Sequence, residues 1–530
     1  MQKILNKLSG QNSIKGATII LIVTLFLSNI LGLARDHFLA QKITTSILDT
    51  YYTAFRIPDL IFNLLILGAI TASFIPVFSK YLTKDNLKEA WHVSNSFLNI
   101  GVVILTIALV ILFFLMPVLI PWMVPNFDTE KMQTTINLSR MLLLSPLFFT
   151  ISYTFGSILN SFKRFLIYSL APLIYNLCII IATLFFTDKF GIYAVAYGVL
   201  IGAFLHMFIQ FIQLKFIGYK YEFVFDWKNK SVQKIFYLMI PRAIGLGVNQ
   251  IMLVVYTAIA STFVAGSIAI FNLADNIQTM PTVVFGISFA TAIFPTLTEH
   301  INLGKKQDFS IHIFKSIRSI TYVLIPISIL IILLRAQIVR LILGSGYFGW
   351  DQTILTYNTL AMFCISLLAQ GLIPLFARAF YAMHNTKTPT YVSVASVIIG
   401  IVFGYVFGNI WGVVGLALAF SCASIFNALA LYIILSREVK EIKQESKGIG
   451  KYIFQVLAAT LVMGIVAQIV KYGSTYFVDM NRFWGVLTQT ILASIAGVIT
   501  YAYISRLFGC EEQQQVIQLI KKYLTPNGKK

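Results

Sequence analysis

About fourteen apolar segments, each long enough to cross a lipid bilayer, occupy nearly all of this 530-residue chain. Hydrophobic residues make up 58% of the sequence and charged residues only 11%. Segments of this kind must be helices, because an isolated strand cannot satisfy its backbone hydrogen bonds in lipid. The loops between them are too short to hold a folded domain. The sequence therefore predicts an all-α polytopic membrane protein with about fourteen transmembrane helices.

The positive charge of the chain is distributed unevenly. With the N-terminus placed inside, most of the 40 Lys and Arg residues fall in the inner loops, for example in the loop Lys215–Lys234. This bias explains the net charge of +20 without nucleic acid, and no nucleic-acid-binding motif accompanies it. It predicts that both termini are cytoplasmic. The tail Glu511–Tyr523 has apolar residues at helical spacing, which predicts a short amphipathic helix on the cytoplasmic surface.

A weak internal repeat predicts how the helices are grouped. The segment Gly68–Ser79 resembles Gly286–Thr298, including Pro76 and Pro295. The repeat predicts two six-helix lobes with substrate between them and alternating access by rocking. Chance similarity between apolar helices is the alternative. The predicted lobes are residues 1–218 (helices 1–6) and 219–440 (helices 7–12), followed by two more helices and the cytoplasmic tail in residues 441–530.

Few charged residues lie inside the predicted spans, and such residues usually face a water-filled cavity. In span 52–79, Arg56, Asp59 and Asn63 share one helical face. The other polar positions are Arg242 and Asn249 in span 235–264, and Asn272, Asp275 and Asn276 in span 268–298. A guanidinium is always charged and binds oxyanions through a planar fork, which favours a phosphate or diphosphate ligand. The alternative is a structural role, with Arg56 paired to Asp59 or Asp275.

The usual signatures of enzymes and metal proteins are missing from the sequence. There is no Walker loop, and no aqueous loop carries a Ser/His/Asp set or paired carboxylates. The four cysteines are scattered and form no CxxC or Cys/His cluster, so no metal site is predicted. We therefore expect a transporter and not an enzyme, without a cofactor.

Four stretches resemble one known family: Leu31–Asp36, Asp49–Leu60, Gly68–Tyr81 and Ala377–Pro389. They are similar to the MurJ (MviN) family of lipid II flippases, part of the MOP superfamily with the MATE exporters. The resemblance covers the whole chain. It implies a multi-pass protein of the bacterial inner membrane that acts in peptidoglycan and cell-wall biogenesis. Its activity would be to move the undecaprenyl-diphosphate-linked peptidoglycan precursor, lipid II, from the cytoplasmic to the outer leaflet.

The resemblance also implies further properties. A cationic cavity between two lobes would take the headgroup, and the two C-terminal helices would form a groove for the lipid tail. Transport would be coupled to membrane potential or to a monovalent cation. Besides the lipid-linked anionic substrate and membrane lipids, proteins of cell-wall elongation or division are possible partners.

The resemblance carries over only some of the family's site residues. Arg35, Asp36, Asp49 and Arg56 match it. Four charged positions of the family are replaced here by Asn29, Phe62, Leu67 and Asn276. We therefore expect Arg35, Arg56, Arg242, Asn249 and Asn276 to bind substrate. Gating or positioning is expected of Asp36, Asp49, Asp59 and Asp275.

Three other functions stay open at this point. The missing arginines leave room for a flippase of another polyprenyl-linked glycan. A MATE-like cation-coupled exporter of small molecules would rely on buried acids, whereas buried arginines are slightly more numerous here. A polyprenyl-phosphate glycosyltransferase would be expected to have a large outer loop with acids, which this sequence lacks.

Overall fold

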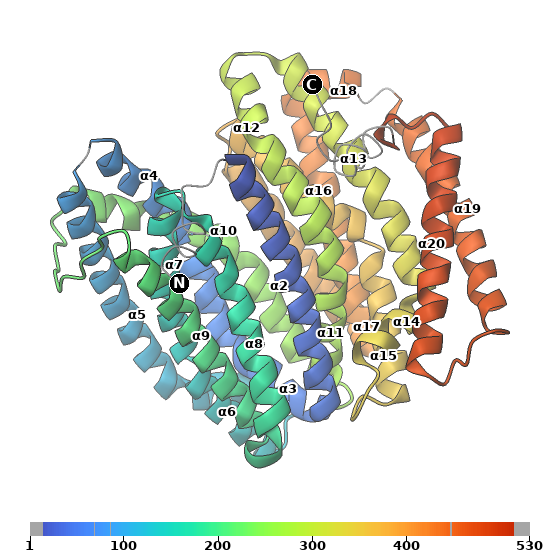
Figure 1. The fold of residues 1–530 in the computed structure, drawn as a ribbon, viewed down its shortest axis with the longest axis horizontal. Coiled ribbons are helices and arrows are strands. Elements are labelled where there is room, and N and C mark those ends of the chain that lie inside the picture. Colours follow the sequence, from blue (N-terminus) through green and yellow to red (C-terminus); the bar gives the residue numbers. More distant parts are fainter. Residues whose placement is uncertain (1–13, 68, 85, 446–447, 514–530) are drawn as a thin grey trace. The chain divides into compact units, whose positions relative to one another are not determined.

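The computed structural model describes residues 14–67, 69–84, 86–445 and 448–513. These residues form helices joined by loops, and no strand occurs among them (Figure 1). The predicted all-α class is confirmed. Of the predicted amphipathic tail Glu511–Tyr523, only residues 511–513 belong to the described part of the chain.

The helices follow one another along the chain with few long connections. In order they are α2 (Ile14–Lys42), α3 (Thr45–Ile61), the π-helix η1 (Phe62–Leu67), α4 (Ala69–Thr83), α5 (Leu87–Met123), α6 (Thr129–Leu142), α7 (Leu144–Ser161), α8 (Phe165–Phe190), α9 (Ile192–Lys215), α10 (Lys230–Ala260), α11 (Ser267–Pro281), the π-helix η2 (Thr282–Ile287), α12 (Ser288–Asn302), α13 (Lys306–Leu333), α14 (Arg335–Leu343), α15 (Trp350–Cys364), α16 (Leu367–Ala382), α17 (Lys387–Glu438), α18 (Lys440–Glu445), α19 (Ile449–Ser474) and α20 (Phe483–Leu507).

Nine helices of the described chain are long and apolar enough to cross a membrane, or ten if the bent pair α15–α16 is one span. Helix α17 is too long for one crossing, because its 52 residues would extend about 78 Å at 1.5 Å per residue. It breaks at Gly412, whose φ of 59° and ψ of −137° are not helical. This break agrees with the predicted separate spans 389–407 and 411–436. A second crossing for α17 and one crossing each for α2, α3–η1–α4 and α10 would raise these ten spans to fourteen. The count of fourteen stays a prediction.

The chain divides into two compact units, one with residues 1–272 and 345–348 and the other with residues 273–344 and 349–530. We call them the first and the second unit. The boundary between them lies within α11, between Asn272 and Leu273, because residues on either side of it contact mainly their own unit. The predicted lobes 1–218 and 219–440 and the segment 441–530 rest on the sequence repeat and stay a prediction.

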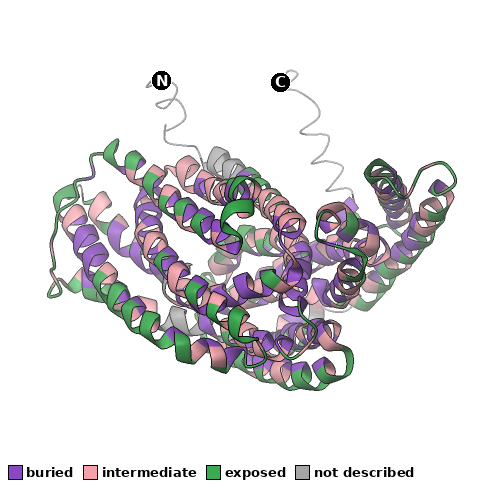
Figure 2. Cartoon of the chain, turned by 90° about the horizontal axis from the view of Figure 1, so that it is seen from below, coloured by how far each residue is buried: buried purple, intermediate pink, exposed green. Residues whose placement is uncertain are grey.

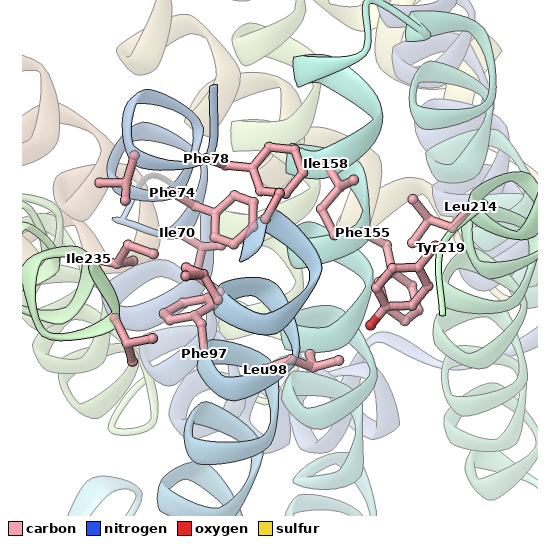
Figure 3. Packing of buried hydrophobic residues seen from close by; sticks show 14 of the residues in the cluster. Ile70, Phe74, Phe78, Phe97, Leu98, Phe155, Ile158, Leu214, Tyr219 and Ile235 are labelled. Atoms are coloured by element: carbon pink, nitrogen blue, oxygen red, sulfur yellow. The ribbon is translucent and has the colours of Figure 1, made fainter. Parts of the chain in front are cut away.

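Aromatic side chains dominate the core of the first unit. Phe74 and Phe78 of α4 stack on each other, and Phe97 of α5 packs against Phe74 (Figure 3). Phe155 of α7 meets Tyr219, which follows α9, in the same cluster. Large rings bury much apolar area at fixed geometry, so this cluster holds α4, α5 and α7 together.

In the second unit, α13 packs against α16 and α19, and α19 pairs with α20 along most of its length (Figure 1). Tyr322 of α13, Val456 and Met463 of α19 and Tyr501 of α20 form the core where these helices meet. Tyr501 Oη donates to Tyr322 O at 2.8 Å. Helices α13, α19 and α20 therefore form one packed group.

Buried and exposed residues alternate along the helices, as Figure 2 shows. Helix α5 is the clearest case of an exposed apolar surface, since Phe114, Val118 and Trp122 are all more than half exposed. Exposed apolar area of this extent fits a helix that faces lipid.

The two repeat segments share a six-residue π-helix at their start, which the sequence did not predict. The π-helix η1 ends at Leu67, directly before the first segment, and η2 contains Gly286, the first residue of the second segment. In α4 and α12, the chain also continues as helix for seven residues beyond Pro76 and Pro295, to Thr83 and Asn302. A π-helix inserts extra residues into the ladder and is rare in helices. Its occurrence at both segments supports a true repeat over chance similarity.

Candidate functional site

Arg35 of α2 is held by two side chains, those of Asp36 and Asn176. Its Nε and Nη2 donate to Asp36 Oδ1 at 3.0 and 2.8 Å, and its Nη1 donates to Asn176 Oδ1 of α8 at 3.3 Å. Asp36 is almost completely buried, whereas the Arg35 side chain is 21% exposed. A guanidinium has five N–H donors, so two of Arg35 make no hydrogen bond within the described residues. Arg35 is therefore oriented but can still bind an anion.

Tyrosines surround this arginine. Tyr51 and Tyr52 of α3 and Tyr175 of α8 all lie within electrostatic range of Arg35. The hydroxyl of Tyr52 is buried and makes no hydrogen bond in the described part of the chain. A buried hydroxyl without a partner costs free energy, so it marks a place where a ligand or water fits.

A cavity of about 230 Å³ lies beside this group. Asp59 of α3, Tyr153 of α7, Tyr175 of α8 and His206 of α9 line it, together with Phe55, Pro58, Phe62, Ser145, Phe149 and Pro172. Asp59 lies within electrostatic range of both Arg35 and Arg56. His206 is held by Ser152, whose Oγ lies 2.6 Å from His206 Nδ1. The cavity is thus a mostly aromatic pocket with one acid.

Arg56 is buried and connects three helices of the first unit. Its Nε donates to Thr257 Oγ1 of α10 at 2.7 Å, and its Nη2 donates to Asn272 Oδ1 of α11 at 2.8 Å. Charge-assisted bonds of this length are strong and directional. Arg56 therefore holds α3, α10 and α11 together. This is a structural role, which the sequence left open as the alternative to substrate binding.

Asp49 is the second connection to α11. Its carboxylate accepts from the backbone N–H groups of Gly266 and Ala269 at 2.7 and 2.9 Å, at the N-terminus of α11. Lys131 Nζ of α6 donates to it at 3.0 Å. A carboxylate is favoured at a helix N-terminus, because the unpaired N–H groups and the helix dipole attract negative charge. Asp49 thus ties α3 and α6 to the start of α11.

The remaining predicted site residues are not brought to this group by the described contacts. Arg242 lies in α10, but its side chain is outside the described residues. Asn249 is exposed on the same helix. Asp275 and Asn276 belong to the second unit, where Asp275 Oδ1 accepts from Gln278 Nε2 at 2.8 Å. Their proposed roles stay predictions.

Sequence reasoning missed Asn176, Tyr52 and Lys131. Asn176 is 141 residues from Arg35 along the chain and lies in an apolar helix. A polar residue in such a helix is itself a signal, because it usually bonds to a neighbouring helix. Lys131 lies in the first turn of α6, outside the predicted spans, so nothing in the pattern linked it to Asp49.

Comparison with known proteins places this geometry in context. The model of the family described as "Lipid II flippase MurJ" matches residues 43–488. A protein of Borreliella burgdorferi named "Probable lipid II flippase MurJ" is 28% identical over 430 residues, which cover 80% of this chain and 84% of that protein. One of the same name from Rhizobium tropici is 27% identical over 495 residues, covering 90% of this chain and 91% of its own.

Solved structures show the same fold. The structure titled "Lipid II flippase MurJ, inward closed conformation" aligns with a TM-score of 0.75 at 25% identity, over 92% of this chain and 98% of that one. An inward-facing multidrug resistance MATE family transporter of the MOP superfamily aligns with a TM-score of 0.70 over 81% of this chain and 99% of its own. At 13% identity, that second likeness concerns the fold alone.

Proposed function

Because the chain belongs to the MurJ family of lipid II flippases, we propose that it moves lipid II across the bacterial inner membrane, from the cytoplasmic to the outer leaflet, by alternating access. The family match and the multi-pass helical fold support this activity. The observation that points to a site is the state of Arg35: Asp36 and Asn176 hold it, and two of its N–H donors make no hydrogen bond to any described residue.

The chemistry of this site suits a diphosphate. A guanidinium stays charged at any physiological pH and can present two parallel N–H groups to a phosphate. Asp36 and Asn176 use three of its five donors, so Arg35 keeps its orientation when no ligand is present. A preorganised donor loses less entropy when it binds its ligand. The nearby Tyr52 hydroxyl offers a further donor.

The carboxylates take supporting roles in this proposal. Asp36 orients Arg35 and offsets its charge, so that the diphosphate can be released after transfer. Asp49 and Arg56 bond α3 to α11, and in this proposal these bonds resist separation of the two helices. Opening the structure between α3 and α11 would require these bonds to break. In this proposal Asp49 therefore keeps the gating role predicted from the sequence, and Arg56, which was predicted to bind substrate, shares that role.

Several further parts of the proposal extend beyond the site. The chain performs transport without covalent catalysis and without a cofactor, driven by membrane potential or a monovalent cation. Both termini lie on the cytoplasmic side, as the distribution of Lys and Arg favours. Proteins of cell-wall elongation or division are expected as partners.

The test is rescue of a bacterium depleted of its own lipid II flippase, with lipid II exposed on the outer leaflet measured in the same cells. Rescue with restored exposure supports the proposal. Failure with verified membrane expression would contradict lipid II as substrate. Mass spectrometry of the lipids that co-purify with the chain would then show whether another polyprenyl-linked glycan takes its place.

A further inference from the structure

An extended segment of the first unit lies between α9 and α10 and runs along α5. Two asparagines of α5 hold three of its backbone carbonyls. Asn95 Nδ2 donates to Lys220 O at 2.9 Å. Asn99 Nδ2 donates to both Glu222 O and Val224 O at 3.0 Å. Where lipid excludes water, a carbonyl outside a helix needs such a partner, so the two asparagines fix the segment on α5.

Aromatic side chains make up more than half of this segment. They are Tyr219, Tyr221, Phe223 and Phe225 of residues 219–225, which we call the aromatic segment. Tyr219 is buried in the core cluster of Figure 3, whereas the other three side chains are 47–77% exposed. Exposed aromatic rings next to apolar helices are typical of a segment at the membrane surface.

A groove of about 400 Å³ lies between the aromatic segment and the helices α5, α7 and α9, and we call it the α5–α9 groove. Val103 of α5, Ile151 of α7 and Phe208 of α9 line it, opposite the three exposed rings. Val103 and Phe208 are each more than 40% exposed, so the groove is open to the surroundings of the helices.

The interior of the α5–α9 groove is apolar. The side-chain nitrogen and oxygen atoms of its lining belong to Asn99 and Tyr221, and Tyr221 Oη donates to Asn99 Oδ1 at 2.9 Å. A sugar or a nucleotide would therefore bury polar groups there without enough partners, which costs free energy. A hydrocarbon chain needs no such partner, so it is the occupant that the lining favours.

A lysine lies at the rim of this groove. Lys215 is in the last turn of α9, and its Nζ lies 4.9 Å from the ring centroid of Phe211, which lines the groove. The dipole of α9 favours a cation at this helix end. Within the described residues, however, neither Lys215 nor Lys220 forms an ion pair. The aromatic segment has one carboxylate, Glu222, and Asp226 beyond it is already paired with α5, so the two lysines leave a net positive charge.

The lysine and the groove share one face of α9. Lys215, Phe211 and Phe208 are spaced by four and three residues, so they lie on the same side of the helix. This face leads from the charged helix end into the groove. In the proposed orientation α9 ends on the cytoplasmic side, where anionic phospholipids attract lysines near the membrane surface. A lipid with its phosphate at Lys215 would therefore have an acyl chain beside the groove.

We propose that the α5–α9 groove binds an acyl chain of an anionic phospholipid of the cytoplasmic leaflet, whose phosphodiester is bound by Lys215. The positive rim selects an anionic over a neutral lipid, and the apolar lining takes the hydrocarbon. This lipid stays with the protein and is not the transported substrate. The proposal rests on the proposed orientation and does not depend on which lipid-linked glycan is moved.

The test is lipid retention by the full chain in nanodiscs with equal amounts of phosphatidylglycerol and phosphatidylcholine, measured by native mass spectrometry. The variant is Lys215→Gln, which removes the charge from an exposed side chain. The control is Lys228→Gln, which removes the same charge from an exposed lysine of the same connection that does not line the groove.

We expect the wild type to retain phosphatidylglycerol in preference to phosphatidylcholine. Lys215→Gln should retain about fivefold less phosphatidylglycerol, as the loss of one lysine at an anionic membrane surface predicts. Lys228→Gln and Lys215→Arg, which keeps the charge, should match the wild type. Equal retention of phosphatidylglycerol by Lys215→Gln and Lys228→Gln would overturn the proposal. A wild type without preference between the two lipids would also overturn it, because that result fits a neutral occupant.

The groove itself is tested by filling it. Val103→Trp places a large ring in the groove, whereas Val110→Trp places the same ring on the same face of α5, two turns further along and outside the groove. We expect only Val103→Trp to lower the retention of both lipids. Equal retention by the two variants would show that no acyl chain lies in the groove.

A second measurement decides if Val103→Trp does not fold. Hydrogen exchange of residues 219–225 should be slower with phosphatidylglycerol than with phosphatidylcholine in the wild type, and equal with the two lipids in Lys215→Gln. Equal exchange in the wild type would contradict the proposal. Because neither measurement uses transport, their failure does not affect the flippase assignment, and failed rescue does not affect this site.

Discussion

Two partly buried cations in each unit differ in what holds them. In the first unit, Arg35 and Lys131 each meet a carboxylate, Asp36 and Asp49 respectively, at 2.8 and 3.0 Å. In the second unit, the hydrogen bonds that Arg335 and Lys471 make within the described residues go to backbone carbonyls at the end of α13. A carboxylate partner balances the charge, whereas a carbonyl orients the cation and leaves its charge in place. The two arrangements should therefore respond differently to the same kind of substitution.

The largest effect is expected at Arg35. Arg35→Ala removes the guanidinium that we assign to the diphosphate, and we expect transport to fall by about 30-fold or more, as a lost charge-assisted bond of about 2–3 kcal/mol predicts. The measurement is rescue and outer-leaflet lipid II at equal protein levels. Arg140→Ala is the control, because among the described residues Arg140 donates to Phe113 O alone and lies over the Phe113 ring. Full transport by Arg35→Ala would remove Arg35 from the site.

The comparison itself is tested by two lysines. Lys131→Met leaves the buried Asp49 without its cation, and we expect the free energy of unfolding to fall by about 2–4 kcal/mol. Lys471→Met removes one hydrogen bond to a carbonyl, which should cost about 1 kcal/mol. Thermal unfolding in detergent without added anionic lipid measures both. Equal losses of unfolding free energy in the two variants would show that the charge of the lysine's partner does not affect stability at these two positions.

The position of Arg35 can be disturbed without removing it. Asn176→Leu deletes the acceptor for Arg35 Nη1 but keeps the Asp36 pair, so the guanidinium stays charged and loses part of its orientation. We expect transport to fall by about three- to tenfold, as the loss of one ordinary hydrogen bond predicts. Asn176→Asp, which keeps the acceptor, should do less harm to the orientation. No change with Asn176→Leu would mean that Asp36 alone positions Arg35.

The smallest effect is expected at an exposed ion pair. Asp226 Oδ2 lies 3.1 Å from His92 Nε2 of α5, and this hydrogen bond holds the pKa of Asp226 below its usual range. A lowered pKa means that the contribution to stability is present above the pKa of a free carboxyl, about 4, and is lost as the pH falls further. Hydrogen exchange in residues 216–229 should therefore rise slightly below about pH 4.

Asp226→Asn is the control for that measurement. It removes the titrating group, so the rise in hydrogen exchange at low pH should disappear. An unchanged pH response in this variant would show that another group in the loop controls it.

Much of the fold could be predicted because apolar length and composition fix it locally. The break at Gly412 between the spans 389–407 and 411–436 is an example, since the polar Asn409 and the glycine follow one apolar run and precede the next. The π-helices η1 and η2 were not predicted, because one or two extra residues in a helical ladder change neither composition nor length.

The candidate site was predicted in part. Arg35 and Asp36 are neighbours in the chain, so their pairing could be expected from the sequence. Asn176 and Lys131 could not be assigned, because they lie 141 and 82 residues from their partners along the chain. For the hydrogen bonds of Arg335 and Lys471 to the end of α13, the sequence offered no signal, since each cation stands alone at a helix end.

The sequence by itself determined that this chain is an all-α membrane protein of the lipid II flippase family. Lipid excludes unpaired backbone groups, so long apolar runs permit one local structure, and the family's motifs are short and contiguous. Only the tertiary structure decided which cations are neutralised and which keep their charge. Which cations are neutralised depends on distances between helices. A carboxylate about 3 Å from a lysine balances its charge, whereas a carboxylate far away in the fold does not.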